Sequence, residues 1–418
     1  MSLKEMNLEQ RIAWFQNERA KYPRVTEEAA AYLLSTDFFK APASTRFHGS
    51  YEGGLFEHSV HVYLWLKRLA KQFAVFPGRE ISAESAFIVG FFHDMCKAGI
   101  YQPTTRNVKD ENGVWQKVPS YDFADPFPMG HGEKSVDIIT RRMGIELCDA
   151  EAMAIRWHMG GFENAKAFRA ACEWEKVMKQ PPMAMLTHLA DSLATYFDEN
   201  TKQQMPEKCR SENMPEEVAP YFSRWLEKLP PKPEQEVFFW LYDQSIGRRP
   251  NGDRMRKVLT DYSDFCSAPA AVNGVLAQSG ALLHVSLETF FRFLQIADVC
   301  CWPKAENTMQ NFAGISLLHG LGKLNAFKLQ ERNVKDENGN WQKVPYYVEA
   351  DDPLPMGSPG VKAVHIYDGY FRDGTEALAI RWIDGPQNDA DFRTCGAAFE
   401  MYPFTFLAYA ANLLAAYL

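Results

Sequence analysis

The chain contains two nearly identical fourteen-residue segments, and this internal repeat constrains its fold more than any other feature. Residues 106–119 read RNVKDENGVWQKVP and residues 332–345 read RNVKDENGNWQKVP, so that one position differs. Weaker similarity continues around both segments, where AMAIRW at residues 152–157 returns as ALAIRW at residues 377–382. Such self-similarity indicates two copies of one structural unit. Arguments about the fold therefore apply to both halves of the chain.

The repeat divides the 418-residue chain into four expected regions. We expect residues 35–200 to form the first copy, with residues 1–34 supplying helices that pack on it. Residues 261–418 are expected to form the second copy. Residues 201–260 contain the proline-rich stretches MPEEVAP and LPPKPEQ and are interpreted as a linker that ends in helices. The duplication is compatible with a pseudo-dimer inside one chain, and the sequence leaves the oligomeric state open.

Each copy is predicted to be mainly helical and to carry one small β-hairpin. After Ser82, a favourable N-cap residue, apolar side chains recur at helical spacing until Gly99 ends the pattern. The exception is the repeated segment, where Asn112-Gly113 lies between Val108 and Trp115 and predicts a two-residue hairpin turn. The predicted fold class is mainly α, a duplicated helical bundle with a β-hairpin insertion in each copy.

Composition limits the classes of partner. The net charge of −8 argues against binding of extended nucleic acid, which needs clustered positive charge, but is compatible with a small nucleotide. The one basic run is interpreted as a solvated surface and consists of Arg248, Arg249, Arg254, Arg256 and Lys257. Eight cysteines without a Cys-x-x-Cys pair favour a reducing compartment. Neither a signal peptide nor a membrane-spanning apolar run is found, so a cytoplasmic protein without membrane contact is expected.

Seven of the ten histidines lie in the first copy, together with two aspartates in apolar surroundings. A lone histidine on an apolar helix face is more often structural than a ligand. A carboxylate at the end of an apolar run, however, is costly to bury unless it is paired or bound to metal. The candidate metal ligands are His58, His93, Asp94, His131, His158 and Asp191. The histidines interpreted as outer-shell or structural are His48, His61 and His188.

The second copy serves as an internal control for these candidates. Aligned by sequence, it keeps two of them, as His284 and His319. The other four positions hold Gly320, Ser358, Ile383 and Asn412. If these residues served only core packing, each would be expected to change independently of the others. Joint loss of four candidate ligands is instead expected where a metal site is no longer maintained. The contrast favours a metal site in the first copy and a degenerate, non-catalytic second copy.

The order of the candidate ligands resembles the HD superfamily of metal-dependent phosphohydrolases. The motifs that carry the resemblance are GGLFEHS at His58, FFHDMCK at His93 and Asp94, GHGEKS at His131, RWHMGG at His158 and HLADSL at Asp191. The two additional histidines, His131 and His158, resemble the two-metal branch of that superfamily. The resemblance implies that His58, His93, Asp94 and Asp191 hold one metal. It also implies that Asp94 bridges to a second metal held by His131 and His158.

The resemblance implies two divalent metal ions as cofactors. Mixed imidazole and carboxylate ligands suit manganese, iron, cobalt, nickel or zinc. In HD phosphohydrolases a lysine at the position of Lys97 contacts phosphate, and the alternative here is a helix-end lysine that complements the helix dipole. Arg106 in the hairpin is a further candidate for substrate contact. The hairpin is nevertheless well preserved in the copy that lost its ligands, which favours a structural or domain-pairing role.

Three functions are compatible with this set of ligands. The leading hypothesis is hydrolysis of a phosphoester or phosphodiester of a nucleotide or short oligonucleotide by a metal-activated water, with Asp94 and Lys97 as the catalytic residues. The second is a mixed-valent di-iron oxygenase, since a branch of the HD superfamily uses the same six ligands. The third is a non-catalytic nucleotide-binding or regulatory module formed by the two copies.

Overall fold

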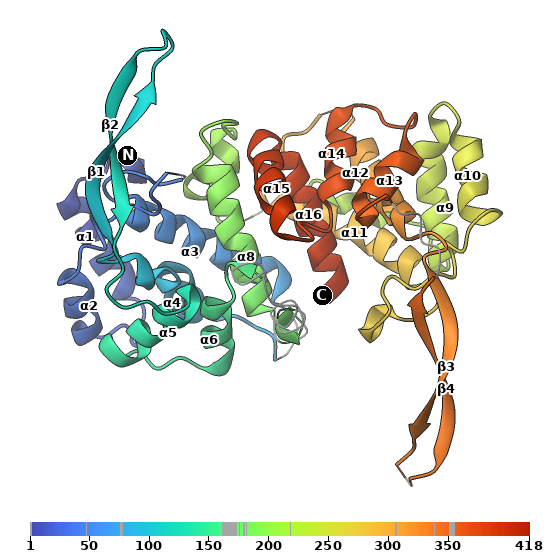
Figure 1. Ribbon diagram of the computed structural model, residues 1–418, viewed down its shortest axis with the longest axis horizontal. Helices are drawn as coiled ribbons and strands as arrows, with labels where there is room; N and C mark the ends of the chain where they lie inside the picture. The colour runs from blue at the N-terminus through green and yellow to red at the C-terminus, as the bar shows by residue number, and fades with distance from the viewer. Residues whose placement is uncertain are drawn as a thin grey trace. The chain divides into compact units, whose positions relative to one another are not determined.

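The chain forms two compact units, Met1–Pro215 and Glu216–Leu418 (Figure 1). The computed structural model describes residues 2–46, 48–75, 78–160, 174, 176–178, 180, 182–217, 219–305, 307–337, 339–350 and 356–418. The boundary falls inside the stretch that was expected to be a linker. In the part of the chain that is described, no helix is both long enough and apolar enough to span a membrane.

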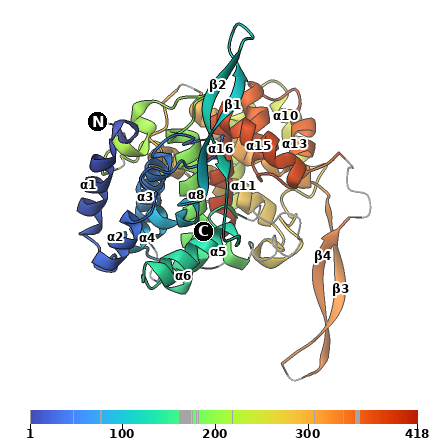
Figure 2. The same ribbon diagram turned by 60° about the vertical axis from the view of Figure 1, so that its left-hand side comes forward.

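The first unit is a helical bundle built around one long helix. Its α-helices are α1 (Leu8–Arg19), α2 (Glu27–Leu34), α3 (Gly54–Phe73), α4 (Ala83–Phe92), α5 (His131–Asp137), α6 (Asp149–Arg156) and α8 (Met183–Leu193). Its shorter turns are η1 (Leu3–Glu5), η2 (Met95–Lys97), η3 (Ile138–Arg142), η5 (Ala194–Asp198), η6 (Glu207–Cys209) and η7 (Ser211–Asn213). Helix α3 is buried over most of its surface, because it packs against both α4 and α8 (Figure 2).

Helix α4 begins where the sequence predicts and ends earlier. The Ser82 side chain accepts a hydrogen bond from the Ser85 N–H, which confirms the predicted N-cap. The prediction that the helix continues to Gly99 is wrong, since α4 ends at Phe92 and a separate 3₁₀ turn follows at Met95–Lys97. Gly99 adopts a left-handed φ of 77° after this turn. The break places His93 and Asp94 between the two helical segments, with both side chains buried.

Each unit carries one antiparallel hairpin, as predicted. Strand β1 (Tyr101–Lys109) pairs with β2 (Trp115–Phe123), and β3 (Phe327–Lys335) pairs with β4 (Trp341–Glu349) in the same register. The predicted two-residue turn is wrong. The Asp110 N–H donates to the Val114 carbonyl and Gly113 has a φ of 76°, so the loop has three residues. The Asp110 carboxylate accepts the N–H groups of Asn112 and Val114, which stabilises this longer loop.

The second unit presents its elements in the same order as the first. Its α-helices are α9 (Glu234–Gln244), α10 (Gly252–Thr260), α11 (Ala281–Val299), α12 (Thr308–Leu318), α13 (Pro359–Tyr367), α14 (Gly374–Trp382), α15 (Asp389–Met401) and α16 (Pro403–Tyr417). Its shorter turns are η8 (Ser223–Lys228), η9 (Ile246–Arg248), η10 (Gly274–Leu276) and η11 (His319–Lys323). Helix α11 packs on α12 and α16, as α3 packs on α4 and α8.

An arginine–glutamate pair with a buried carboxylate occurs in the same place in both units. Arg24, which precedes α2, contacts the Glu151 carboxylate on α6 with both terminal nitrogens at 2.7 Å. Arg249, which precedes α10, contacts Glu376 on α14 at 2.7 and 2.9 Å. Helices α9 and α10 therefore stand in the second unit where α1 and α2 stand in the first. Part of the stretch expected to be a linker thus belongs to the folded second unit.

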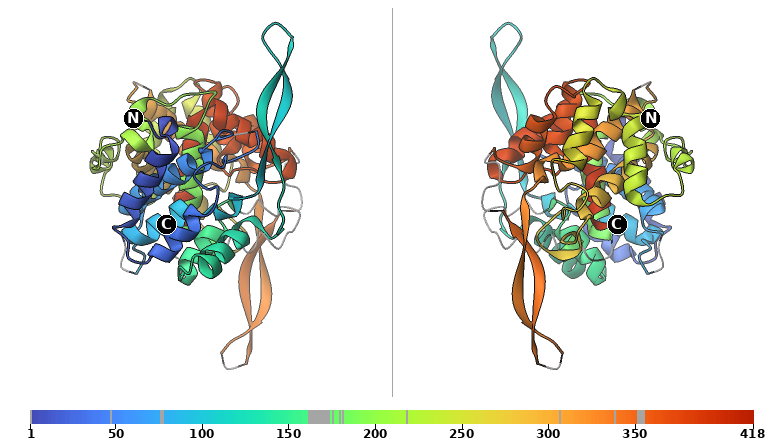
Figure 3. Two further views of the ribbon diagram at one scale, coloured as in Figure 1. Left: turned by 90° about the vertical axis from the view of Figure 1, so that its left-hand side faces the viewer. Right: turned by 90° about the vertical axis from the view of Figure 1, so that its right-hand side faces the viewer.

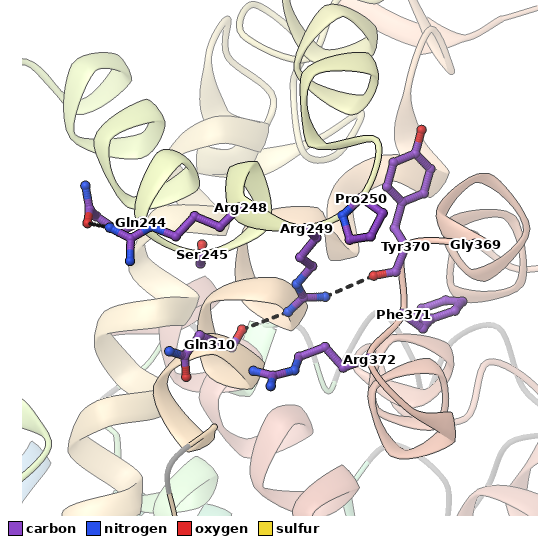
Figure 4. Close-up of a pocket in the computed structure, with 10 residues that line it drawn as sticks. All are labelled: Gln244, Ser245, Arg248, Arg249, Pro250, Gln310, Gly369, Tyr370, Phe371 and Arg372. Atoms are coloured by element: carbon purple, nitrogen blue, oxygen red, sulfur yellow. Dashed lines mark hydrogen bonds between the residues drawn. The ribbon is translucent and has the colours of Figure 1, made fainter.

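The interpretation of the basic run as a wholly solvated surface is wrong for Arg249. Its side chain is only 9% exposed and lies at a pocket of about 420 Å³. The guanidinium donates to the carbonyl oxygens of Gln310 and Tyr370, as Figure 4 shows, and to the Tyr367 hydroxyl. These contacts come from segments far along the chain, so local charge patterning does not reveal them. Arg249 is a structural cation that ties α10 to α14.

Candidate metal centre

The carboxylate of Asp94 lies at the centre of the predicted cluster. Its Oδ1 is 2.8 Å from His131 Nε2 and 3.5 Å from His158 Nε2. Its Oδ2 is 3.3 Å from His93 Nε2 and 3.6 Å from His58 Nε2. Four imidazoles therefore point the same nitrogen, Nε2, at one carboxylate.

The Nε2 atom of His58 faces not only Asp94 but also the remaining predicted ligand, Asp191. Its Oδ1 is 3.1 Å from His58 Nε2. The structure thus brings all six predicted side chains together, although they come from five separate segments. These are α3, the break after α4, the start of α5, the residues after α6, and α8.

Backbone carbonyls hold two of the imidazoles in the orientation that a metal requires. The Nδ1–H of His93 donates to the Gly90 carbonyl at 2.8 Å, and the Nδ1–H of His158 donates to the Ile155 carbonyl at 2.7 Å. The proton of each neutral ring therefore sits on Nδ1, and the Nε2 lone pair is available. His188 supports this arrangement by donating from Nδ1 to the His158 carbonyl at 2.8 Å.

Side chains hold the other two imidazoles. His58 Nδ1 lies 3.0 Å from Glu199 Oε1, and His131 Nδ1 lies 3.2 Å from the sulfur of Cys96. Glu199 and Cys96 were not among the predicted residues. Nothing in the local sequence around Glu199 marks it, because it contacts α3 from a position 141 residues away. Its presence follows only from the folded structure.

Glu199 also connects the cluster to a second layer of ionisable groups. His61, interpreted as an outer-shell residue, places Nδ1 3.0 Å from Glu199 Oε1 and Nε2 3.1 Å from Glu212 Oε1. His48 stacks at an angle on His58 with ring centroids 5.1 Å apart. The pKa of His48 is lowered to about 4 by burial, so this imidazole stays neutral.

The electrostatics of the cluster favour charged carboxylates. Burial opposes ionisation of Asp94, but Lys97 and the surrounding imidazoles outweigh it and hold its pKa well below the usual value. Burial likewise opposes protonation of His58, yet Glu199 and Asp191 raise its pKa to about 10. Burial of His131 is outweighed by Asp94, which raises its pKa to about 9. Because a ligating nitrogen must be unprotonated, a cation that binds here competes with protons for both rings.

The residues present fit a bound cation. The Nε2 atoms of His93 and His158 are buried and make no hydrogen bond, although both lie near Asp94. A buried polar atom without a partner is costly unless something else satisfies it. Within the described residues, three groups of potential ligand atoms each lie within 4.8 Å of one another. They are His48, His58 and Glu199; His58, His93 and Asp94; and Asp94, Cys96 and His131. The donor set suits a divalent transition metal.

Lys97 is directed into the cluster. Its Nζ lies 2.6 Å from Asp94 Oδ2, and its side chain is largely buried. Because α4 has already ended at Phe92, Lys97 does not sit in the last turn of that helix. Lys97 is the last residue of the three-residue 3₁₀ turn η2, so the alternative interpretation as a helix-end lysine applies to that short turn. Its contact with Asp94 places a positive charge beside the central carboxylate.

Arg106 is not brought to the cluster. It is exposed on β1, five residues beyond Tyr101, so an extended strand carries it roughly 16 Å from the start of the hairpin. In the described part of the chain no hydrogen bond or ion pair joins Arg106 to any of the six side chains. A contact between Arg106 and substrate stays a prediction.

The second unit retains fewer candidate ligands than the sequence alignment suggested. Gly53 and Gly280 are equivalent N-caps of α3 and α11, both with a φ of 82°. Counting from them places Val285, not His284, at the position of His58. His284 is one residue out of register, 45% exposed, and paired with Glu234 at 2.9 Å. The assignment of His284 as the counterpart of His58 is therefore wrong.

His319 is the counterpart of His93 and repeats its backbone contact, donating from Nδ1 to the Ser316 carbonyl at 2.8 Å. The hydrogen-bond network beside His319 differs from the one beside His93. Asp384 follows the apolar Ile383 and accepts a hydrogen bond from the Asn412 amide at 3.0 Å. Within the described residues of this unit, no group of three His, Cys, Asp or Glu side chains is arranged to hold a metal.

The stability of the second unit is expected to fall in mild acid because of His319. Burial lowers the pKa of His319 to about 4. As the pH falls from about 6.5 towards 4, His319 becomes protonated in the unfolded chain but stays neutral in the folded protein. Folding is therefore disfavoured over this range. Between about pH 7 and pH 5 this costs about 2 kcal/mol. Denaturation of wild type and His319→Gln at both pH values should show a smaller loss in the variant.

The exposed His365 offers a control for that measurement. His365→Gln should keep the pH dependence of the wild type. Equal slopes for wild type and His319→Gln would contradict the prediction.

A buried cluster of imidazoles and carboxylates inside a helical unit defines a candidate metal-dependent hydrolase. Comparison with known families agrees with this class. Residues 55–196 match the family model of the HD domain, whose members are generally metal-dependent phosphohydrolases. The match contains all six side chains of the cluster and Lys97. No curated protein and no solved structure matches the chain.

Replacement of Glu199 by glutamine is expected to weaken metal binding about tenfold to 100-fold, the usual cost of losing an outer-shell partner. Glutamine keeps the shape but removes the negative charge that faces His58 Nδ1 at 3.0 Å. Titration of the metal-free protein with Mn²⁺ or Zn²⁺ by calorimetry measures the change. Glu212→Gln, which contacts His61 but not His58, is the matched control and should bind metal nearly as wild type does.

Proposed function

We propose that the first unit is a metal-dependent phosphohydrolase that hydrolyses a phosphoester or phosphodiester of a nucleotide or short oligonucleotide. The observation that carries this proposal is the convergence of four imidazoles on the Asp94 carboxylate, with Asp191 at 3.1 Å from His58 and Lys97 at 2.6 Å from Asp94. The HD domain match over residues 55–196 supports the same class of chemistry.

Two divalent ions would be held by the six side chains. One would be bound by His58, His93, Asp94 and Asp191. The other would be bound by His131 and His158, with Asp94 shared between the two. When bound, such a pair supplies an activated water and stabilises the charge that develops on the phosphoryl oxygens.

The positive charge of Lys97 favours binding of an anionic substrate at this site. Its ammonium is buried next to Asp94, and Asp94 raises the pKa of Lys97 further despite burial, so the charge is permanent. A permanent cation beside the reacting centre binds and orients a phosphoryl oxygen. Lys97 therefore favours an anionic substrate, and the metal and oxygen-uptake measurements below separate hydrolysis from oxygenase chemistry.

A small substrate is favoured over a long nucleic acid. The chain carries a net charge of −8, and long-range attraction of a polyanion needs the opposite sign. A nucleotide needs only the local charges of the metals and of Lys97. We further propose that the second unit is a degenerate copy, which the repeated sequence and the shared order of elements support.

The test is metal analysis of freshly purified protein, followed by anaerobic turnover of a nucleotide and phosphodiester panel with Mn²⁺, Fe²⁺, Co²⁺, Ni²⁺ or Zn²⁺. The proposal expects about two metals per chain and metal-dependent release of phosphate or nucleotide. Bound iron with an EPR signal from a half-reduced pair and substrate-dependent oxygen uptake would indicate the oxygenase instead. Protein that binds no metal and hydrolyses nothing in the panel would indicate the binding module.

A further inference from the structure

The two hairpins extend away from the helices of their units and pack mainly on themselves (Figure 3). Large apolar side chains near their tips are open to solvent. Trp115 is 64% exposed in the first hairpin, and Trp341 is 68% exposed in the second. A lone two-stranded hairpin is only marginally stable in water. Hairpins of this length with exposed tryptophans are therefore expected to be covered by a partner.

Sequence identity is concentrated on this exposed surface. The hairpin segments share thirteen of fourteen residues, while only His319 remains of the six ligand positions when the units are aligned on their N-cap glycines. No packing against a core explains the identity, because these residues are mostly exposed. The local surfaces also match, since Lys109 lies 5.1 Å from the Trp115 ring and Lys335 lies 5.2 Å from the Trp341 ring. Both hairpins thus present one surface suited to one kind of partner.

Charge limits the kind of partner. Residues 101–123 contain three basic and three acidic side chains, and residues 327–349 contain four of each. A balanced hairpin on a chain of net charge −8 has no electrostatic preference for nucleic acid or an anionic membrane. A balanced and repeated surface is instead suited to another copy of itself.

The backbone shows which edge of each hairpin is open. Antiparallel pairs alternate between hydrogen-bonded and non-hydrogen-bonded positions. The Asp110 N–H bonds to Val114 and the Asp336 N–H bonds to Asn340, so counting from these pairs turns Pro119 and Pro345 towards the outer edges of β2 and β4. Proline lacks the N–H that an added strand needs. By the same count, the outer edge of β1 presents donors at residues 105, 107 and 109, and that of β3 at residues 331, 333 and 335. Pro103 also faces outward, so the open edge of β1 is confined to the half of the strand nearer the turn.

We propose that the outer edges of β1 and β3 pair antiparallel with the same edges of a second copy of this chain. A two-fold axis at Asn333 places Lys335 of one copy opposite Glu331 of the other, twice per contact. Opposite charges at directly facing positions stabilise antiparallel pairs. The equivalent axis in the first hairpin passes Asn107 and places Lys109 opposite Thr105, without the charge pair. The contact is isologous in both cases. This inference is independent of the proposed hydrolysis.

The test uses the full-length chain and the double variant Asn107→Pro/Asn333→Pro. Both positions direct their N–H outward, so proline removes a donor from the open edge while leaving the bonds within each hairpin in place. The matched control is Asn107→Thr/Asn333→Thr, which keeps the donors. Sedimentation equilibrium over a concentration series gives the mass, and circular dichroism confirms that the helices are folded.

The expected result is concentration-dependent dimers or larger assemblies of the wild type and of the threonine control. The proline variant should associate at least about tenfold more weakly, because each two-fold contact loses two backbone hydrogen bonds. A wild type that stays monomeric at every concentration would overturn the inference, as would an unchanged mass for the proline variant. Binding of a labelled single-stranded oligonucleotide by a monomeric wild type, lost in Trp115→Ala/Trp341→Ala, would assign the hairpins to nucleic acid instead.

Discussion

Asp94→Asn is expected to lower turnover by more than about 100-fold and to lower the bound metal content, while the helices stay folded. Loss of an outer-shell partner alone costs up to about 100-fold, and Asp94 is the carboxylate that all four imidazoles face. Asparagine has the same shape but neither the charge nor the two equivalent oxygens needed to share two cations. Metal analysis and turnover of the best substrate in the panel measure the effect.

His319→Ala is the matched control for that experiment. It alters the second-unit counterpart of His93, which has no cluster of ligands around it among the described residues. Its turnover and metal content should equal those of the wild type. Full turnover by Asp94→Asn would show that the assignment of two metals is wrong. A large loss of turnover in folded His319→Ala would show that the second unit takes part in catalysis.

Glu376→Gln is expected to lower the free energy of unfolding of the second unit by about 3–5 kcal/mol, the cost of removing one partner of a buried ion pair. The Glu376 side chain is fully buried and contacts Arg249 at 2.7 and 2.9 Å. It also accepts the Arg372 N–H at 2.9 Å. Glutamine of the same size leaves the Arg249 guanidinium buried without a counter-charge. Urea denaturation monitored by circular dichroism measures the loss.

An exposed pair in the same unit provides the comparison. Lys232 and Glu236 lie 2.9 Å apart with side chains 54% and 55% exposed. Glu236→Gln should change the free energy of unfolding by less than about 0.5 kcal/mol, because solvent screens an exposed pair. If both variants are equally stable, the buried pair makes no net contribution and the predicted loss is contradicted.

The candidate ligands could be identified from the sequence because each lies next to a local signal. His58 follows the glycine N-cap of α3, and His93 and Asp94 directly follow the apolar run AFIVGFF that ends α4. His131 and His158 lie beside Gly130 and Gly160, at the ends of helices. Glycines, apolar runs and N-caps act within a few residues, so sequence patterns record them. The structure brings these side chains together.

The residues that orient the ligands were not identified from the sequence, because their contacts join distant segments of the chain. Glu199 contacts His58 across 141 residues of chain, and Cys96 contacts His131 across 35. Neither contact leaves a pattern in the sequence near the residue concerned. The same holds for Arg249, whose partner Glu376 lies 127 residues away. The hairpin segments are 226 residues apart (332 − 106), whereas the N-cap glycines Gly53 and Gly280 are 227 apart (280 − 53), so an alignment that follows the hairpins misplaces His284 by one residue.

The amino-acid sequence alone predicted the helical class, the presence of a hairpin in each half, and the six side chains that the structure brings together at Asp94. These depend on periodicity, on turn residues and on a repeat, all of which are properties of short segments. The folded structure was needed to establish which imidazole nitrogen faces inward, which carboxylate orients it, where α4 ends and which hairpin edges stay open. Those features arise from contacts between distant segments, whose geometry exists only after the helices have packed.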